Sequence, residues 1–236
     1  MVLSIVIPAY NEEDTIAGCL EAIAGQRTRE EFEVIVVDNG SQDRTAAIAG
    51  AFKTKMKLRV LEERTKGRGA ARARGFGAAH GTIILSSDAD ARVPPDWIDV
   101  MVGALKRSGC VAVTGPCHID DCSSLSNRLF NAFQPVSMRI YRSVTGHYWL
   151  TGSNFAITRD AYAASGGFNP EINAQEDIDL SFRVRRVGEI RFVPGASVWV
   201  SGRRFKRGLF RGLFPYASTF TQTFVFKRHV DLSDDR

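Results

Sequence analysis

The sequence predicts an α/β fold with a mostly parallel central sheet. Over the first half of the chain, short apolar runs of strand length alternate with amphipathic segments of helix length. The run at residues 83–85 is apolar without interruption, which is typical of a parallel strand buried on both faces. A chain of 236 residues is also long enough to bury a sizeable core.

The predicted elements follow one another in a regular order. Strands are expected at residues 3–7, 32–37, 58–61, 82–86 and 111–114, and helices from Asn11, from near Ser41, and at 69–79, 94–106 and 125–141. Asn11 is expected to cap the first helix, whose residues Ile16, Cys19, Leu20 and Ile23 form an apolar stripe for packing on the sheet. These apolar residues are interpreted as scaffold.

No polar linker divides the chain, so a single domain over residues 1–236 is expected. Its pattern changes after residue 114, where a long helix and then a Gly/Ser/Asn-rich segment replace the strand and helix alternation. We therefore distinguish a ligand-binding half at about 1–116, a second half at about 117–206, and a basic and aromatic C-terminal helix at about 207–236.

Composition restricts the class of partner. The 31 basic and 26 acidic residues give a net charge of +5, which suits a diphosphate or an anionic membrane and does not require nucleic acid. The first residues enter a strand without a signal-peptide pattern, and no apolar run reaches membrane-spanning length, so a cytoplasmic protein is expected. The four cysteines lack CxxC spacing and are interpreted as reduced thiols; a metal site at residues 117–122 is the less favoured alternative.

A pair of carboxylates follows the fourth predicted strand. Asp88 and Asp90 come just past its carboxyl end, where open α/β sheets bind ligands. In an extended backbone residues two apart point the same way, so both carboxylates are expected on one face. Two hard oxygen ligands suit Mg²⁺ or Mn²⁺ that bridges a substrate diphosphate. A polar loop with two solvated acids is the alternative.

Two further segments could contact a nucleotide. Asp38 ends the second strand, where its carboxylate can accept hydrogen bonds from a base or a ribose, although a simple capping turn at Ser41 would also explain the segment. The basic turn at residues 66–72 lacks the third glycine of a dinucleotide motif, because Arg72 stands there. Such a turn before a helix could still meet phosphate, and Arg72 is the favoured residue, with solvated surface charge as the alternative.

Acidic residues also begin a predicted helix near the end of the chain. Glu176 and Asp177 lie in its first turn, where the helix dipole stabilises an ionised carboxylate. Such a carboxylate could act as a general base towards an acceptor hydroxyl, and plain helix capping explains the acids equally well.

The last part of the chain mixes basic and aromatic residues. Basic residues at positions 203–211 interleave with aromatic and apolar residues at helical spacing. This mixture suits a helix on an anionic membrane surface, and packing on the domain's own core is the alternative.

Taken together, several short motifs resemble one family. They are Pro8-Ala9-Tyr10-Asn11-Glu12, the segment 37–45, Ala71-Arg72 with Gly75, Asp88-Ala89-Asp90, Gly152-Ser153-Asn154 and Glu176-Asp177. From residue 3 to about residue 207 the chain resembles the inverting family 2 glycosyltransferases with the GT-A fold. The resemblance implies that one sugar moves from a UDP or GDP donor to a hydroxyl acceptor, lipid-linked acceptors included, in a single displacement with inversion.

The resemblance implies a role for each matching position. Nucleotide contacts are expected from Pro8, Tyr10, Glu12, Asp38, Arg72 and Asp88, metal ligands from Asp90 and Asp88, sugar or acceptor contacts from Gly152, Ser153 and Asn154 together with Glu176, and the catalytic base from Asp177. The two halves at about 1–116 and 117–206 then become the nucleotide-sugar and acceptor sides.

The chain departs from the family at one position. Many members carry a histidine metal ligand after the last core strand, where this chain has Ser201 and Gly202. Arg203 or Arg204 could replace part of the metal's contribution at the diphosphate. A peripheral position on the inner face of a membrane fits the short chain. A sugar nucleotidyltransferase and a non-catalytic membrane-surface module with the same fold are the alternatives, and nucleic-acid binding is not expected.

Overall fold

The computed structural model describes residues 2–205, apart from the Arg204 side chain. The predicted C-terminal helix at about 207–236 lies outside the described residues. No helix in the described part is long and apolar enough to cross a membrane.

Seven strands of the described chain form one sheet in the order β3-β2-β1-β4-β7-β5-β8. They are β1 (Val2–Ala9), β2 (Glu31–Asp38), β3 (Leu58–Glu62), β4 (Ile83–Ser86), β5 (Ala112–Thr114), β7 (Phe155–Thr158) and β8 (Ile190–Phe192). Strand β7 is antiparallel to β4 and β5, and every other neighbouring pair is parallel. The predicted mostly parallel sheet is therefore confirmed. A small second sheet pairs β6 (Cys117–His118) with β9 (Val198–Trp199).

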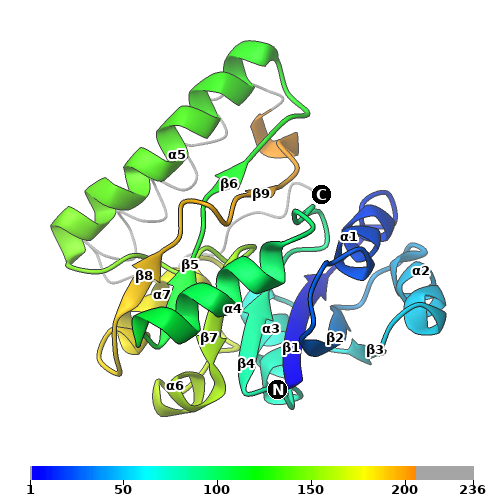
Figure 1. The fold of residues 1–236 in the computed structure, drawn as a ribbon. Coiled ribbons are helices and arrows are strands. Elements are labelled where there is room, and N and C mark those ends of the chain that lie inside the picture. The colour runs from blue at the N-terminus through cyan, green and yellow to red at the C-terminus, as the bar shows by residue number, and fades with distance from the viewer. Residues whose placement is uncertain (1, 206–236) are drawn as a thin grey trace.

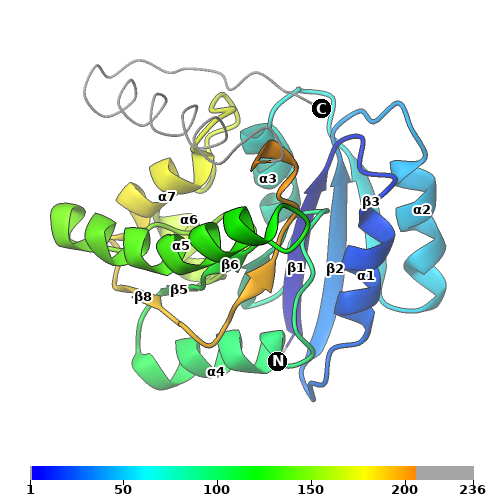
Figure 2. The ribbon, with the colours of Figure 1, turned by 90° about the horizontal axis from the view of Figure 1, so that it is seen from above.

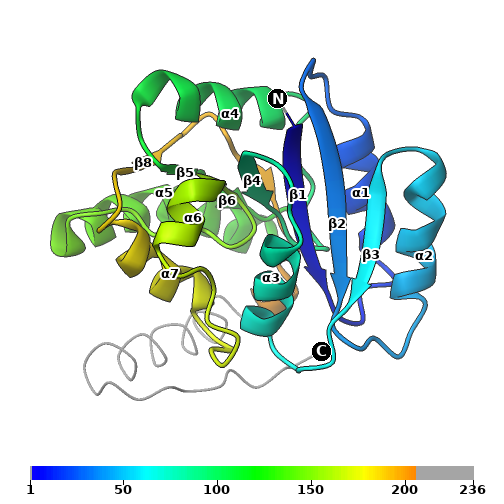
Figure 3. The same ribbon diagram turned by 90° about the horizontal axis from the view of Figure 1, so that it is seen from below.

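Helices cover both faces of the large sheet (Figure 3). One face packs on α1 (Ile16–Ala24), α2 (Thr45–Ala51) and α4 (Trp97–Ser108), and the other on α3 (Arg68–Gly77), α6 (Arg159–Ala164) and α7 (Glu176–Val184). Residues alternate along β1, so Ile5 and Ile7 join the first core and Val6 joins the second. This alternation explains why the strands read as continuous apolar runs. The described residues also form two short 3₁₀ helices, η1 (Phe52–Thr54) after α2 and η2 (Arg203–Phe205) after β9.

The sheet order places three strand ends at one edge. Strands β2, β1 and β4 are adjacent and parallel, with Ala9 opposite Asp38 and Val6 opposite Ser86. The chain runs from β1 to β2 and β3 on one side (Figure 2) and returns to β4 on the other side of β1 (Figure 3). This is a topological switch point, where open α/β sheets bind ligands.

The long helix α5 (Ser124–Thr145) stands beside the large sheet rather than on either of its faces (Figure 1). Its predicted core at 125–141 extends by one residue at the start and four at the end. The Asn131 amide holds the helix to the main chain of Ile119, with hydrogen bonds of 2.8 and 3.0 Å. Helix α5 is thereby attached to the segment after β6. Its residues also border the cavity at the carboxyl ends of β1 and β4.

The predicted helix starts at Asn11, near Ser41 and at residue 94 were wrong, the last because α4 begins at Trp97. Asn11 does not cap α1, which begins at Ile16 after Thr15, and α2 begins at Thr45 rather than near Ser41. Asn11 has a φ of 50°, which asparagine tolerates, and its N–H donates to Ser41 Oγ at 3.0 Å. Both residues therefore join the loops after β1 and β2 to each other instead of opening helices.

Candidate active site

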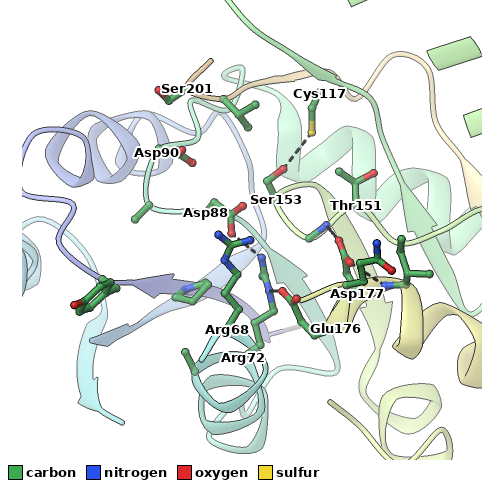
Figure 4. A pocket seen from close by; sticks show the side chains of 18 of the residues that line it. Arg68, Arg72, Asp88, Asp90, Cys117, Thr151, Ser153, Glu176, Asp177 and Ser201 are labelled. Carbon is green, nitrogen blue, oxygen red and sulfur yellow. Dashed lines mark hydrogen bonds and ion pairs between the residues drawn. The ribbon is translucent and has the colours of Figure 1, made fainter. Parts of the chain in front are cut away.

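A cavity of about 900 Å³ opens at the switch point and extends to α5. Its lining comes from the ends of β1 and β4, from α3 and α7, and from aromatic residues of and near α5. The predicted site residues that line it are Pro8, Tyr10, Glu12, Arg72, Asp88, Asp90, Gly152, Ser153, Glu176, Asp177 and Arg203. Segments that are remote in the sequence thus meet in one cavity (Figure 4).

Arg72 connects the two acidic motifs. Its buried guanidinium donates to Asp88 Oδ1 at 2.6 Å and to Glu176 Oε1 at 3.1 Å (Figure 4). It also donates to Ser86 Oγ at 2.6 Å. Only 2% of Arg72 is exposed. Burial opposes its charge, but the Asp88 and Glu176 carboxylates raise the pKa of Arg72 above its usual range. Arg72 is therefore fully engaged in positioning these two acids.

The backbone turns between the two aspartates. The N–H of Ala91 donates to the Asp88 carbonyl at 3.0 Å, so the extended backbone expected from Asp88 to Asp90 was wrong. The two side chains have different cationic neighbours, Arg72 for Asp88 and Arg203 for Asp90. A tight turn after β4 explains this difference, since residues two apart share a direction only in an extended strand.

Arg203 joins Asp90 to Glu12. Its Nη2 lies 3.1 Å from Asp90 Oδ2, and both of its terminal nitrogens donate to the Glu12 carboxylate, Nη1 at 2.9 Å. Glu12 is only 4% exposed and also accepts from Thr15 Oγ1 at 2.8 Å. Arg203 thus reaches the Asp90 carboxylate from the segment that follows Ser201 and Gly202.

Asp177 is held in the first turn of α7. Its Oδ2 accepts from the Gly152 N–H at 2.9 Å, and its Oδ1 accepts from the Ile178 N–H at 2.8 Å. Burial and the negative charge of Glu176 raise the pKa of Asp177 to about 7, against the opposing effect of Arg72. A carboxylate with this pKa can accept a proton near neutral pH.

Within the turn at residues 151–154, two residues line the cavity and a third is buried behind it. Gly152 and Ser153 line the cavity, and the Gly152 carbonyl accepts from Ser86 Oγ at 2.7 Å. A Cβ at Gly152 would lie 2.7 Å from Arg72 Nη2, so a larger residue there would displace the Arg72 guanidinium from its carboxylate partners. Asn154 does not line the cavity: it is fully buried, accepts from Trp97 Nε1 at 2.9 Å and donates to the Ala196 carbonyl at 2.6 Å.

At the β1 and β2 end, the predicted base contacts lie beside residues that the sequence interpretation had not selected. Tyr10 lines the cavity, and Lys66 Nζ lies 3.9 Å from its ring centroid. Among the described lining residues Asn39 is present and its neighbour Asp38 is not; Asp38 Oδ1 accepts from the Ser41 N–H at 3.3 Å. The Asn39 amide donates to the carbonyls of Glu63 and Thr65 at 2.9 and 2.7 Å, which holds the basic turn over this end.

Arg68 is a cavity residue that the sequence interpretation had not favoured. It is the first residue of α3, is partly exposed, and extends its side chain into the cavity on the side of Asp88 (Figure 4). The sequence feature that could have identified Arg68 is its position at the start of the helix after Gly67, one turn before Arg72. Spacing alone could not tell which of the two arginines is buried.

The alternative metal site at residues 117–122 does not form. Cys117 contacts Ser153 Oγ at 3.1 Å, while Asp120 pairs with Arg92 and Asp121 accepts from Ser201. Over residues 2–205 no group of three or more His, Cys, Asp or Glu side chains could hold a metal ion. A cation in the cavity would therefore need ligands from its substrate or from water.

Comparison with known proteins identifies related sequences. Residues 4–165 match the family described as Glycosyl transferase family 2. The chain is 29% identical over 212 residues to the probable glycosyltransferase YdaM of Bacillus subtilis, which is 84% of this chain and 50% of that protein. It is 33% identical over 115 residues to the dolichol-phosphate mannosyltransferase of Pyrococcus furiosus, which is 48% of this chain and 32% of that protein. The chain thus spans half or less of the length of these curated relatives.

Solved structures share the fold. The S. aureus TarS 1-349 structure in complex with UDP-GlcNAc matches 86% of this chain and 59% of its own, with a TM-score of 0.70 and 19% identity. The Pyrobaculum calidifontis mannosyltransferase PcManGT in complex with GDP-Man and Mn²⁺ matches 92% of this chain and 64% of its own, with a TM-score of 0.68 and 23% identity. At these identities the likeness supports a common GT-A-like architecture.

Proposed function

This chain belongs to glycosyl transferase family 2, and on that premise we propose that its cavity transfers one sugar from a nucleoside diphosphate donor to a hydroxyl acceptor with inversion. One observation carries the proposal. Asp88 and Asp90 at the switch point and Asp177 in α7 line the same cavity, although Asp177 follows Asp88 by 89 positions in the sequence. One cavity thus holds two carboxylates that could bind a metal on the donor diphosphate and a third that could accept the proton of the acceptor hydroxyl.

We assign the nucleoside to the β1 and β2 end of the cavity. Pro8, Tyr10 and Asn39 offer a surface for the base, and Asp38 remains a candidate for the ribose. Arg68 is the proposed cation for the diphosphate, because its guanidinium extends into the cavity whereas that of Arg72 is engaged with carboxylates. Arg203 is proposed as a further diphosphate contact if it exchanges its carboxylate partners Glu12 and Asp90 for the donor, and the expected contact from Arg204 falls on a side chain outside the described residues.

The chemistry of two carboxylates suits a divalent cation that takes its remaining ligands from the substrate and from water, since the described residues assemble no group of three ligands. Asp88 and Asp90 supply hard oxygen ligands, and Mg²⁺ is commonly bound by one or two carboxylates with substrate phosphates and waters completing its shell. Mn²⁺ suits the same oxygen donors. Bound there, either ion would stabilise the negative charge of a departing diphosphate. The Mn²⁺ in the PcManGT complex supports this assignment.

Asp177 is the proposed general base. Its Oδ2 bond to the Gly152 N–H fixes the carboxylate, and its pKa of about 7 lets it accept the proton of an attacking hydroxyl. The hydroxyl oxygen would form the new bond to the anomeric carbon as the diphosphate leaves from the opposite side. A single displacement of this kind inverts the configuration.

The acceptor is proposed to enter from the α5 side. Phe130, Phe133 and Tyr141 of α5, with Trp149, give that end of the cavity an aromatic lining. The names of two curated relatives specify a lipid phosphate, dolichol phosphate in one and undecaprenyl phosphate in the other, which supports a lipid-linked acceptor for this chain.

Donor turnover tests the proposal. A panel of UDP- and GDP-sugars is incubated with Mn²⁺ and a lipid extract, and nucleotide release is measured for the native chain and for Asp177→Asn. We expect Asp177→Asn to lower turnover at least about a hundredfold with donor binding retained, because only the proton acceptor is lost. Asp160→Asn is the matched control, since Asp160 lies exposed in the first turn of α6 and should turn over normally.

Three outcomes would contradict the proposal. Equal turnover in Asp177→Asn would remove the assigned base. Pyrophosphate release from a sugar phosphate and a nucleoside triphosphate would indicate a nucleotidyltransferase. Vesicle binding without nucleotide binding or turnover would instead favour a non-catalytic membrane-surface module.

A further inference from the structure

Helix α5 exposes an apolar stripe along its whole length. Its six residues recur at intervals of three or four, which places them on one side of a helix, and they are between 44% and 81% exposed. The stripe consists of Leu125, Leu129, Phe133, Val136, Ile140 and Val144. An apolar surface of this length marks an interaction site more often than it occurs on an isolated domain.

The stripe is not the side of α5 that holds the helix to the domain. The buried residues of α5 are Gln134, Met138 and Tyr141, which lie on the other side of the helix, and Asn131 bonds to the main chain of Ile119. The described part of the domain thus packs on one side of α5, and the stripe lies on a different side, which meets the cavity at Phe133.

The charges of α5 indicate what covers the stripe. Arg128, Arg139 and Arg142 are exposed, and helical periodicity places all three along one edge of the stripe. The 22 residues of α5 include no Asp or Glu. An amphipathic helix with an apolar side and a purely basic flank suits an anionic bilayer, where apolar residues enter the lipid and arginines meet headgroup phosphates.

Charge disfavours the other occupants. A second copy of the chain would bring three more arginines against these three, and like charges across an interface are unfavourable. The sequence after residue 205 is basic at Lys206, Arg207 and Arg211 and acidic only near its end, at Asp231, Asp234 and Asp235, so only its last residues could complement the arginines of α5.

We propose that α5 docks the protein on an anionic phospholipid bilayer, with its apolar stripe in the interface and its axis parallel to the surface. Phe133 belongs both to the stripe and to the cavity lining, so the docked bilayer lies at the α5 end of the cavity. This membrane contact does not depend on the proposed transfer reaction, because it uses an outer surface of the domain.

Vesicle sedimentation of the full chain tests the proposal. Partition onto phosphatidylglycerol and phosphatidylcholine vesicles is compared for the native chain and for Leu129→Glu/Ile140→Glu. We expect the double variant to lose at least about tenfold in partition onto the anionic vesicles, since two apolar side chains no longer enter the lipid. The control is Val187→Glu, which adds a charge at an exposed apolar residue outside α5 and should partition like the native chain.

A second variant tests whether the arginines of α5 contribute to vesicle binding, and it leaves the apolar stripe unchanged. Arg139→Ala is expected to weaken partition about fivefold, in a manner that added salt reduces. Circular dichroism and thermal unfolding verify that each variant is folded.

Four results would overturn the proposal. They are a native chain that does not bind anionic vesicles, equal binding to neutral vesicles, a double variant that binds as the native chain does, and a native dimer that the double variant converts to a monomer without any vesicle binding. The third result would place the membrane contact outside α5, and the fourth would make the stripe a contact between copies of the chain.

Discussion

At the scale of single residues, two arginines one turn apart in α3 have opposite surroundings. Arg72 is buried between Asp88 and Glu176, whereas Arg68 extends into the cavity. Arg72→Met should cost roughly 3–5 kcal/mol of unfolding free energy, because it leaves two carboxylates without their partner. Arg68→Met should change that free energy by less than about 0.5 kcal/mol and weaken nucleoside diphosphate binding about tenfold or more.

Urea denaturation and calorimetric titration check this pair of variants. An Arg72→Met chain as stable as the native one would show that the buried ion pairs do not hold the site. Unchanged nucleotide affinity in Arg68→Met would exclude Arg68 as the diphosphate contact.

The pKa of Asp177 gives a pH dependence of defined sign. Burial and the charge of Glu176 raise that pKa to about 7. A general base works in its ionised form, so kcat/KM, which reports ionisation of the free enzyme, should rise as the pH increases through about 7 and then level off, and should fall about tenfold per unit at lower pH. The kcat/KM of donor turnover between about pH 5 and about pH 9 measures this profile. A flat profile between about pH 6 and about pH 8 would contradict Asp177 as the base.

At the scale of elements, α3 owes its position to a glycine. A Cβ at Gly69 would lie 2.2 Å from the Ile172 carbonyl oxygen and 2.5 Å from that of Asn169, so the backbone would have to move. Gly69→Ala should therefore lower the unfolding free energy by about 1–3 kcal/mol, as overpacking does. The matched control is Gly77→Ala at the other end of α3, where a Cβ meets nothing within 4 Å.

The control should range from neutral to about 1 kcal/mol more stable, since alanine favours the helix. Urea denaturation of both variants decides the question. Equal stability of the two would mean that close packing of α3 against residues 169–172 is not required.

The hydrophobic pattern of the sequence predicted most helices and strands correctly. It did not predict where the helices begin or how the polar loops between the elements fold. The strands and the stripe of α1 follow from apolar spacing, because burial in two packed layers demands that spacing. Asn11 and Ser41 look like helix caps locally, but they bond across two loops that are 30 positions apart in the sequence. The turn at Asp88 likewise depends on contacts that spacing does not encode.

At the scale of the whole molecule, the site consists of long-range pairs. Arg72 and Glu176 are 104 positions apart, and Arg203 and Glu12 are 191 apart. Resemblance to a family could select most of these residues, since their motifs are short and specific. It could not indicate that Arg72 is buried, that Arg203 reaches Asp90, or that Arg68 enters the cavity, because folding alone creates those contacts.

The central claim is a nucleoside diphosphate site that uses Asp90 and a divalent cation. Calorimetric titration of UDP and GDP with Mn²⁺, Mg²⁺ or EDTA tests it most directly, on the native chain, on Asp90→Asn and on the control Asp96→Asn, whose aspartate is exposed before α4. We predict that one nucleotide binds with metal, that EDTA or Asp90→Asn weakens its binding at least about tenfold, and that Asp96→Asn binds normally. Binding that is indifferent to metal and to Asp90, or no binding of either nucleotide, would contradict the account.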